Sequence, residues 1–224
     1  MSIISLQDVR KEYRMGETSV EALSDADVEI EEGEFVAVMG PSGSGKSTLM
    51  NMIGALDVPT DGNVNIGADD ISTFSEDQLA VLRSKKIGFI FQQFNLIPTM
   101  NATENVALPM LFTGVSKKDR RKRAEMLLEK VGLGDRLTHM PSELSGGQRQ
   151  RVSIARSLAN DPDIVLADEP TGNLDQETGE KIMDLLTDLN QEGKTIVMVT
   201  HDEEDASYAD RIINIVDGKT GVRE

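Results

Sequence analysis

Short apolar runs alternate with helical patterns along most of the chain, which predicts an α/β fold. Glycine or polar residues bound each run, as expected of strands buried within a sheet. Two further segments, Ile3–Val9 and Val28–Ile30, show apolar alternation and predict an antiparallel sheet beside the main core. The runs that predict buried strands are Phe35–Met39, Ile87–Phe91, 163–169, Thr195–Thr200 and Ile212–Val216.

Turn and helix signals separate these runs. Pro59–Gly62 is a turn signal, and the apolar alternation of Asn63–Ile66 after it predicts a hairpin. Ser75 and Gln78 have the spacing of a capping box at the start of a helix.

From about residue 101 to residue 160 the pattern changes to helices alone. Helical spacing covers Thr103–Leu111 and Ser116–Val131, and glycines follow the second segment. We therefore expect one domain over residues 1–224, with a helical lobe at 101–160 inserted into an α/β core formed by 1–100 and 161–224.

Composition narrows the class of protein. The 224 residues include no cysteine, which excludes disulfides and Cys-ligated metal, and the formal net charge is −16. Such a surface repels phosphate backbones, so we expect no nucleic-acid partner. No signal peptide and no apolar stretch long enough to cross a bilayer is evident, and we expect a soluble intracellular chain.

One dense positive cluster opposes this acidity. Six of the seven residues in 117–123 are Lys or Arg, and they open the helix predicted over Ser116–Val131. This arrangement favours a solvated helix face, and the alternative is a patch for lipid headgroups or nucleic acid.

The strongest chemical signal is a glycine-rich loop between the strand Phe35–Met39 and a helical pattern. It fits the phosphate-binding pattern G-x-x-x-x-G-K-[ST]. In this context the backbone N–H groups and the helix N-terminus surround a polyphosphate, the lysine reaches the β- and γ-phosphates, and the first hydroxyl residue ligates Mg²⁺. The residues concerned are Gly40, Ser42, Gly43, Ser44, Gly45, Lys46, Ser47 and Thr48.

Polar residues follow three other predicted strands. Gln92 follows Ile87–Phe91, the pair Asp168 and Glu169 ends the strand at 163–169, and His201 follows Thr195–Thr200. Ligands meet α/β sheets at strand ends, and paired carboxylates beside a phosphate loop position Mg²⁺ and a water molecule. A lone histidine is more often structural, but its place at a strand end favours a phosphate contact for His201. His139 has no such placement.

For two features, the residues alone are compatible with two interpretations each. Leu144-Ser145-Gly146-Gly147-Gln148 precedes a helix, and its two glycines either form an anion site or make a flexible cap. Tyr13 lies between the antiparallel strands and either stacks on a purine or covers an apolar edge.

Taken together, these motifs resemble the nucleotide-binding subunit of ATP-binding-cassette (ABC) transporters over nearly the whole chain, from Tyr13 to His201. The complete Leu-Ser-Gly-Gly-Gln upstream of an acid-ending strand is the most specific feature. The resemblance implies an α/β P-loop NTPase core with a mainly parallel sheet, an N-terminal antiparallel β subdomain and an inserted helical lobe.

The resemblance also implies roles for the matching residues. Lys46 would bind phosphate, Tyr13 would stack on the adenine of ATP, and His201 would contact the γ-phosphate. Ser47, Gln92 and Asp168 would hold Mg²⁺, and Glu169 would polarise the attacking water. Ser145 and Gly147 would bind the γ-phosphate of a nucleotide held by a second copy, and Gly146, Gln148 and Asp175 would also belong to the nucleotide-binding site. ATP would thus join two copies head to tail in a homodimer.

A finer resemblance concerns the segments 54–62, 91–98 and 167–175, which are similar to the lipoprotein-release, macrolide-export and cell-division (LolD/MacB/FtsE) subfamily. It implies an ATPase that powers a separate membrane permease at the cytoplasmic face of the membrane. The main alternative is a regulatory ATPase of a cell-division complex that transports nothing. A DNA-repair cassette would need a long coiled coil before Leu144, and a small-molecule kinase would leave residues 144–148 without a purpose.

Overall fold

The computed structural model of the chain describes residues 2–16 and 18–223. These residues fall into two units, one formed by 1–83 with 193–224 and the other by 84–192. The segment expected as a helical lobe, 101–160, lies within the second unit. Each unit has its own strands and helices, and each is described by itself.

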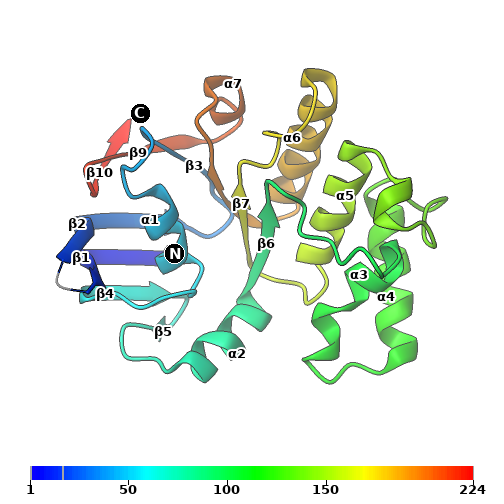
Figure 1. Cartoon of the computed structure of the whole chain (residues 1–224), viewed down its shortest axis with the longest axis horizontal. Coiled ribbons are helices and arrows are strands. Elements are labelled where there is room, and N and C mark those ends of the chain that lie inside the picture. The colour runs from blue at the N-terminus through cyan, green and yellow to red at the C-terminus, as the bar shows by residue number, and fades with distance from the viewer. Residues whose placement is uncertain (1, 17, 224) are drawn as a thin grey trace. The chain divides into compact units, whose positions relative to one another are not determined.

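The first unit contains the antiparallel sheet expected near the N-terminus (Figure 1). Its strands are β1 (Ser2–Met15), β2 (Thr18–Glu31), β4 (Asp61–Ile66) and β5 (Asp69–Asp70), in the order β2-β1-β4-β5. Ile4 of β1 stands opposite Ile30 of β2 and Ile66 of β4, and all three side chains are buried. The hairpin predicted at Pro59–Gly62 is wrong, because β4 pairs with β1 and β5 and not with the segment before the turn.

The first unit also contains parallel strands. β3 (Phe35–Met39) lies between β8 (Thr195–Val199) and β9 (Arg211–Val216) and runs parallel to both, while β10 (Lys219–Arg223) is antiparallel to β9. The short helix α7 (Glu203–Ala206) follows β8, and α1 (Lys46–Ile53) follows β3. Since β3 and β8 are parallel, their carboxyl ends lie at the same edge of the sheet. The glycine-rich loop after Met39 and the histidine after Thr200 both follow these carboxyl ends.

The second unit pairs β6 (Ile87–Phe91) with β7 (Ile164–Asp168) in parallel, as their apolar runs predict. The helix α2 (Glu76–Lys86) leads into β6, and its start has the predicted capping bond from Ser75 N to Gln78 Oε1 at 2.9 Å. The longer helices α5 (Gly146–Ser157) and α6 (Gln176–Gln191) precede and follow β7.

The helical segment of the second unit contains α3 (Ala102–Ala107) and α4 (Lys117–Lys130) (Figure 1). The helix predicted over Thr103–Leu111 is interrupted: α3 ends at Ala107, and a 3₁₀ turn, η1 (Pro109–Leu111), follows. Pro109 has no N–H to continue the helical ladder, which accounts for the break. A second 3₁₀ turn, η2 (Pro141–Glu143), precedes α5. In the described part of the chain, no helix has the length and apolar character needed to span a membrane.

Candidate functional site

The glycine-rich loop of the first unit is tightly enclosed by backbone. A Cβ atom on Gly40 would lie 2.1 Å from the carbonyl oxygen of Ile215, and one on Gly45 would lie 2.5 Å from that of Ala22. Gly45 also has φ +108°, a left-handed conformation that side chains disfavour. The glycines at these two positions therefore allow the loop to curl between β2 and β9.

The loop and the helix after it have the features of an anion site. Among the described residues, no side chain caps the N-terminus of α1, and no acidic residue lies in the first turn of this helix. The hydroxyl of Ser44 is buried and has no hydrogen-bond partner in the described part of the chain. The amino group of Lys46 folds back over the loop and donates to the carbonyl oxygens of Gly40, at 2.7 Å, and Pro41, at 2.9 Å. Unsatisfied donors at a helix N-terminus with a lysine above them fit a polyphosphate.

Tyr13 of β1 is held beside α1 by a buried charge. Its hydroxyl donates to Asp57 Oδ2 at 3.2 Å, and Lys11 Nζ lies 5.1 Å from the centre of its ring. Lys11 in turn contacts Asp57 Oδ1 at 2.7 Å and donates to the carbonyl of Val58 at 2.7 Å. Burial raises the pKa of Tyr13, and the negative charge of Asp57 adds to the increase. This Lys11–Asp57–Tyr13 cluster fixes the tyrosine ring in one orientation. Lys11 is buried, which no local sequence pattern indicates.

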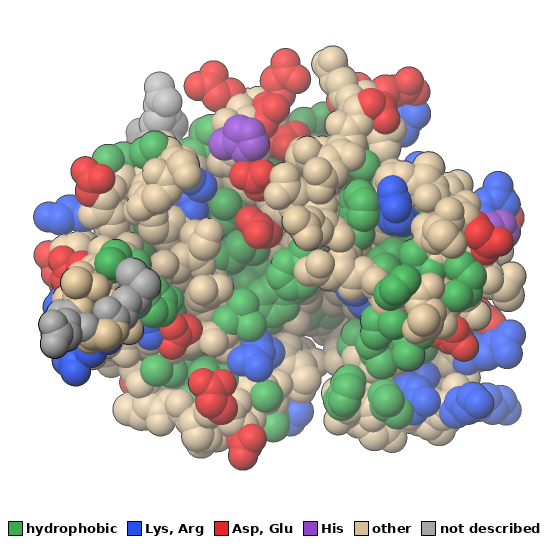
Figure 2. Space-filling model, viewed as in Figure 1, with side chains coloured by type: hydrophobic (Ala, Val, Ile, Leu, Met, Phe, Trp, Pro, Cys, Tyr) green, Lys and Arg blue, Asp and Glu red, His purple; other side chains and the backbone are tan. Residues whose placement is uncertain are grey.

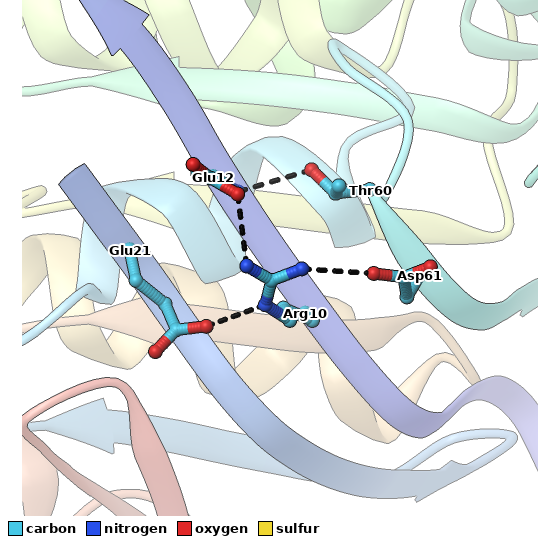
Figure 3. Close-up of polar contacts among 5 residues, drawn as sticks. All are labelled: Arg10, Glu12, Glu21, Thr60 and Asp61. Atoms are coloured by element: carbon cyan, nitrogen blue, oxygen red, sulfur yellow. Dashed lines mark hydrogen bonds and ion pairs between the residues drawn. The ribbon is translucent and has the colours of Figure 1, made fainter. Parts of the chain in front are cut away.

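A second charged group links β1, the strand that carries Tyr13, to its two neighbouring strands (Figure 3). Arg10 of β1 contacts Glu21 of β2 at 2.5 Å, Asp61 of β4 at 3.0 Å and Glu12 at 2.8 Å. The hydroxyl of Thr60 accepts the backbone N–H of Glu12 at 3.0 Å. The hydrogen bonds that Arg10 donates to Glu21 and Asp61 raise the pKa of its guanidinium. One guanidinium therefore links three adjacent strands at this end of the sheet.

His201 shares a cleft with the start of the glycine-rich loop. The cleft has a volume of about 630 Å³, and its lining includes His201, Met39 and Gly40. All three lie at carboxyl ends of strands in the first unit, as the sequence predicts. His139, in contrast, belongs to the second unit, where its carbonyl oxygen accepts the N–H of Ala102 at 2.9 Å.

In the second unit, Asp168 is the last residue of β7 and Glu169 follows it directly, so both carboxylates lie at the carboxyl end of this strand. Both side chains are partly exposed. Glu169 has φ +44°, a left-handed conformation that costs about 1 kcal/mol for a residue with a side chain. This turn directs the chain away from the strand immediately after Asp168. Within the described residues, no group of three or more His, Asp or Glu side chains could hold a metal ion by itself. A Mg²⁺ ion that a few protein oxygens share with phosphates fits this donor set.

Gln92 lies against the turn that follows these carboxylates. A Cβ on Gly172 would be 2.7 Å from Gln92 Nε2, and Asn173 Nδ2 donates to the carbonyl of Gln92 at 2.8 Å. The end of β6 and the turn after β7 are thus brought together in the second unit.

Two residues of α5 that the motifs did not single out stabilise this region. Gln150 is fully buried and donates to the carbonyl of Pro170 at 2.6 Å. Arg156 donates to the carbonyl oxygens of Phe94 and Asn95, two successive residues with positive φ. Arg156 thus holds the loop after Gln92, and Gln150 holds the turn after β7. Their partners are backbone atoms far away in sequence, so no local pattern could have identified them.

The segment 144–148 forms the N-terminus of α5. Ser145 is the N-cap: its Oγ accepts the N–H of Gln148 at 3.3 Å, and Gln148 Oε1 accepts the N–H of Ser145 at 2.9 Å. Because the Ser145 oxygen acts as an acceptor, its O–H remains available to donate to an anion. The arrangement is an ordered capping box, and a merely flexible cap is not observed.

The same helix start packs closely against α6. A Cβ on Gly147 would lie 2.3 Å from Thr178 Cγ2. Thr178 also donates, through its N–H at 3.0 Å and its hydroxyl at 2.8 Å, to Asp175, the N-cap of α6. These hydrogen bonds from Thr178 lower the pKa of Asp175. The structure thus shows Asp175 capping a helix, a structural role that the sequence reading did not assign to it.

Comparisons with known proteins agree with this arrangement. The sequence model of the ABC transporter family matches residues 23–172. The uncharacterized ABC transporter ATP-binding protein YknY of Bacillus subtilis is 54% identical over 216 residues, which are 96% of this chain and 94% of that protein. The macrolide export ATP-binding/permease protein MacB of Brucella melitensis is 52% identical over 97% of this chain, which spans only 34% of MacB.

Solved structures give the same result. The ATP-binding cassette MJ0796 from Methanocaldococcus jannaschii, in a dimeric post-hydrolysis state bound to ADP and Pi, superposes with a TM-score of 0.90 and 50% identity. The match covers 99% of this chain and 98% of that one. The predicted P-loop NTPase fold is confirmed, and so is the resemblance to the nucleotide-binding subunit of ABC transporters. The chain therefore belongs to the ABC transporter family, as an ATP-binding cassette that binds and hydrolyses ATP.

Proposed function

We propose that the chain is the ATPase subunit that powers a membrane permease encoded as a separate protein, through ATP-driven head-to-tail dimerisation. The observation that carries this proposal is the near full-length identity to ATP-binding proteins such as YknY, combined with similar identity to the cassette portion of MacB. The first relation supports a cassette that is a separate protein, and the second supports a membrane partner of the export type. Export, lipoprotein release and mechanical transmission across the membrane are the activities that fit this subfamily.

In this proposal, the first unit binds the nucleotide. Tyr13 stacks on adenine, and the N–H groups at the start of α1 surround the phosphates. Lys46 leaves the carbonyl oxygens of Gly40 and Pro41 and donates to the β- and γ-phosphate oxygens. His201 contacts the γ-phosphate, since it shares a cleft with Gly40. Positioning and charge neutralisation of this kind supply most of the catalysis of phosphoryl transfer.

The residues Ser47, Gln92 and Asp168 would hold Mg²⁺, which neutralises phosphate charge when it is bound. Glu169 accepts a hydrogen bond from the attacking water and orients it toward the γ-phosphate. The left-handed backbone at Glu169 sets the position of its side chain relative to the end of β7, because the chain turns directly after Asp168.

The segment 145–148 completes the site of a second copy. Ser145 donates its free O–H, and the N–H groups at the start of α5 add a second anion-binding terminus. The dimeric MJ0796 structures support two copies as the functional unit. Each copy then contributes both a glycine-rich loop and a capping segment, so a two-fold dimer contains two equivalent sites. The cassette would act at the cytoplasmic face of the membrane, as a peripheral subunit.

The test is Glu169→Gln, an isosteric change that removes the carboxylate. We expect unchanged ATP binding and almost no turnover, with ATP-dependent dimers accumulating. The variant would then be used with ATP to capture partners from detergent-solubilised native membranes, and the same variant without ATP would be the control. Turnover at the parental rate would contradict the role of Glu169. Recovery of a permease with few spans and a large extracytoplasmic domain supports transport, whereas recovery of cell-division proteins alone would favour the regulatory alternative.

A further inference from the structure

The exposed face of α4 concentrates positive charge in a strongly acidic chain. Residues 117–123 carry a net charge of +5, whereas the whole chain carries −16. Lys117, Lys118, Arg121 and Lys122 are exposed, while Ala124, Leu127 and Leu128 face the interior. The charge therefore lies on the solvent side of an amphipathic helix.

Three of these cations have no partner among the residues that the structure describes. Arg121 contacts Glu125 at 2.7 Å, and Arg123 donates to the carbonyl of Ala159 at 2.7 Å. For Lys117, Lys118 and Lys122, in contrast, the described residues supply no hydrogen bond or ion pair to the amino group. These three lysines are available to an external anion, at no cost of breaking an internal contact.

Large apolar side chains are exposed in the segment that precedes α4 and on α4 itself. Phe112 is 79% exposed, the highest value among the exposed large hydrophobic residues described, and Leu111 next to it is 50% exposed. On α4 itself, Met126 is 52% exposed and continues the stripe of Lys118 and Lys122 at helical spacing. Figure 2 shows hydrophobic and Lys/Arg side chains lying together over the part of the molecule where Figure 1 places α3 and α4.

The mixture of unpaired lysines and protruding apolar side chains matches the chemistry of an anionic lipid surface, where headgroups carry negative charge above an apolar interior. A permease loop is a poorer match, because cytoplasmic loops of membrane proteins are enriched in Lys and Arg and would repel this cluster. We propose that the basic-apolar patch formed by Leu111, Phe112, Lys117, Lys118, Lys122 and Met126 binds the anionic headgroups of the membrane. The proposal rests on the proposed peripheral membrane function.

The charge of the rest of the chain gives the patch a specific role. An acidic surface is repelled by an anionic bilayer, and the repulsion extends about 8 Å at physiological ionic strength. The patch is a local exception that selects which face of the cassette approaches the bilayer. Lipid contact would therefore orient the cassette before it engages a permease.

The experiment is cosedimentation of the full chain with protein-free vesicles, made either of phosphatidylcholine alone or of phosphatidylcholine and phosphatidylglycerol. We compare the parent with the triple variant Lys117→Gln, Lys118→Gln, Lys122→Gln. The matched control removes three exposed or partly exposed lysines elsewhere, Lys85→Gln, Lys181→Gln and Lys219→Gln, so that both variants have the same net charge. Phe112→Ser tests the apolar part, with Val81→Ser on α2 as its control.

We expect the parent to bind only the anionic vesicles, more weakly as salt is added. Each lysine near such a surface contributes about five-fold, so the cluster variant should lose on the order of 100-fold, and Phe112→Ser roughly ten-fold. The control variants should stay within a few-fold of the parent. ATP turnover in solution should be the same for all these variants, which separates this test from that of Glu169.

Three results would overturn the proposal. The parent could bind both kinds of vesicle equally or neither, or the two triple variants could lose the same affinity. The chain could also be retained on native membranes but not on vesicles of the lipids extracted from them, which would assign the patch to a protein partner. None of these results would alter the ATPase assignment.

Discussion

Lys11 provides the sharpest test of the proposal that Tyr13 stacks on adenine. The substitution Lys11→Met keeps most of the apolar stem but removes the charge. Three contacts are lost: the ion pair with Asp57, the bond to the carbonyl of Val58 and the position over the Tyr13 ring. The Lys11 side chain is 11% exposed, so water cannot readily replace these contacts in the folded chain.

The expected cost follows from this burial. Removing one partner of a fully buried ion pair costs roughly 3–5 kcal/mol, because the other charge is left uncompensated. The Asp57 side chain is 30% exposed and can be partly hydrated, so we expect a smaller loss, about 2–3 kcal/mol. For a chain of this size that corresponds to a decrease in Tm of about 5–10 °C. Lys85→Met, at an exposed position on α2, should change stability by less than about 0.5 kcal/mol.

The same substitution should separate binding from chemistry. With the ring of Tyr13 no longer held, the proposed stacking on adenine should weaken, and KM for ATP should rise up to about five-fold while kcat stays close to the parental value. Lys11→Arg keeps the charge and should restore most of both properties. Urea unfolding and steady-state ATP turnover measure the two effects. A stability loss below about 0.5 kcal/mol, or a fall in kcat with KM unchanged, would refute the reasoning.

Two further predictions concern stability. Gly147→Ala places a Cβ against Thr178 Cγ2 and should destabilise the chain by about 1–3 kcal/mol in urea unfolding, and adding Thr178→Ser should recover part of the loss; no recovery would show that this contact is not the cause. Burial by itself raises the pKa of Glu34, but hydrogen bonds from Arg211 and the N–H of Glu31 hold it below its ordinary 4.5. Ionised Glu34 therefore stabilises the fold above about pH 4.5, and this contribution is lost as pH falls through the folded-state pKa. Glu34→Gln should lose less stability than the parent between about pH 5 and pH 3, and equal losses in acid unfolding curves would contradict this assignment.

The sequence predicted the features that depend on neighbouring residues. The glycine-rich loop and the capping segment at Ser145 are local patterns, and the structure contains both. The outer part of β2 was missed because residues 18–21 are exposed on both faces, so no apolar alternation marks them. The partner of β4 was misjudged because it is β1, a long-range pairing that leaves no local signal. Lys11 and Gln150 were missed for a related reason, since the buried contacts that define them are made with distant segments.

The enclosure of the glycine-rich loop also has a consequence for how the protein is made. The carbonyl of Ser44 accepts the N–H of Gly218 at 2.9 Å, and the carbonyl of Gly218 accepts the N–H of Ser24 at 2.9 Å. These bonds join the loop to a turn that is synthesised more than 170 residues later. On the ribosome, the loop therefore emerges early but lacks its native support until the last strands are available. Nascent chains should bind ATP only after residue 218 has been released. ATP binding by a nascent chain would therefore indicate that the glycine-rich loop has gained its native support.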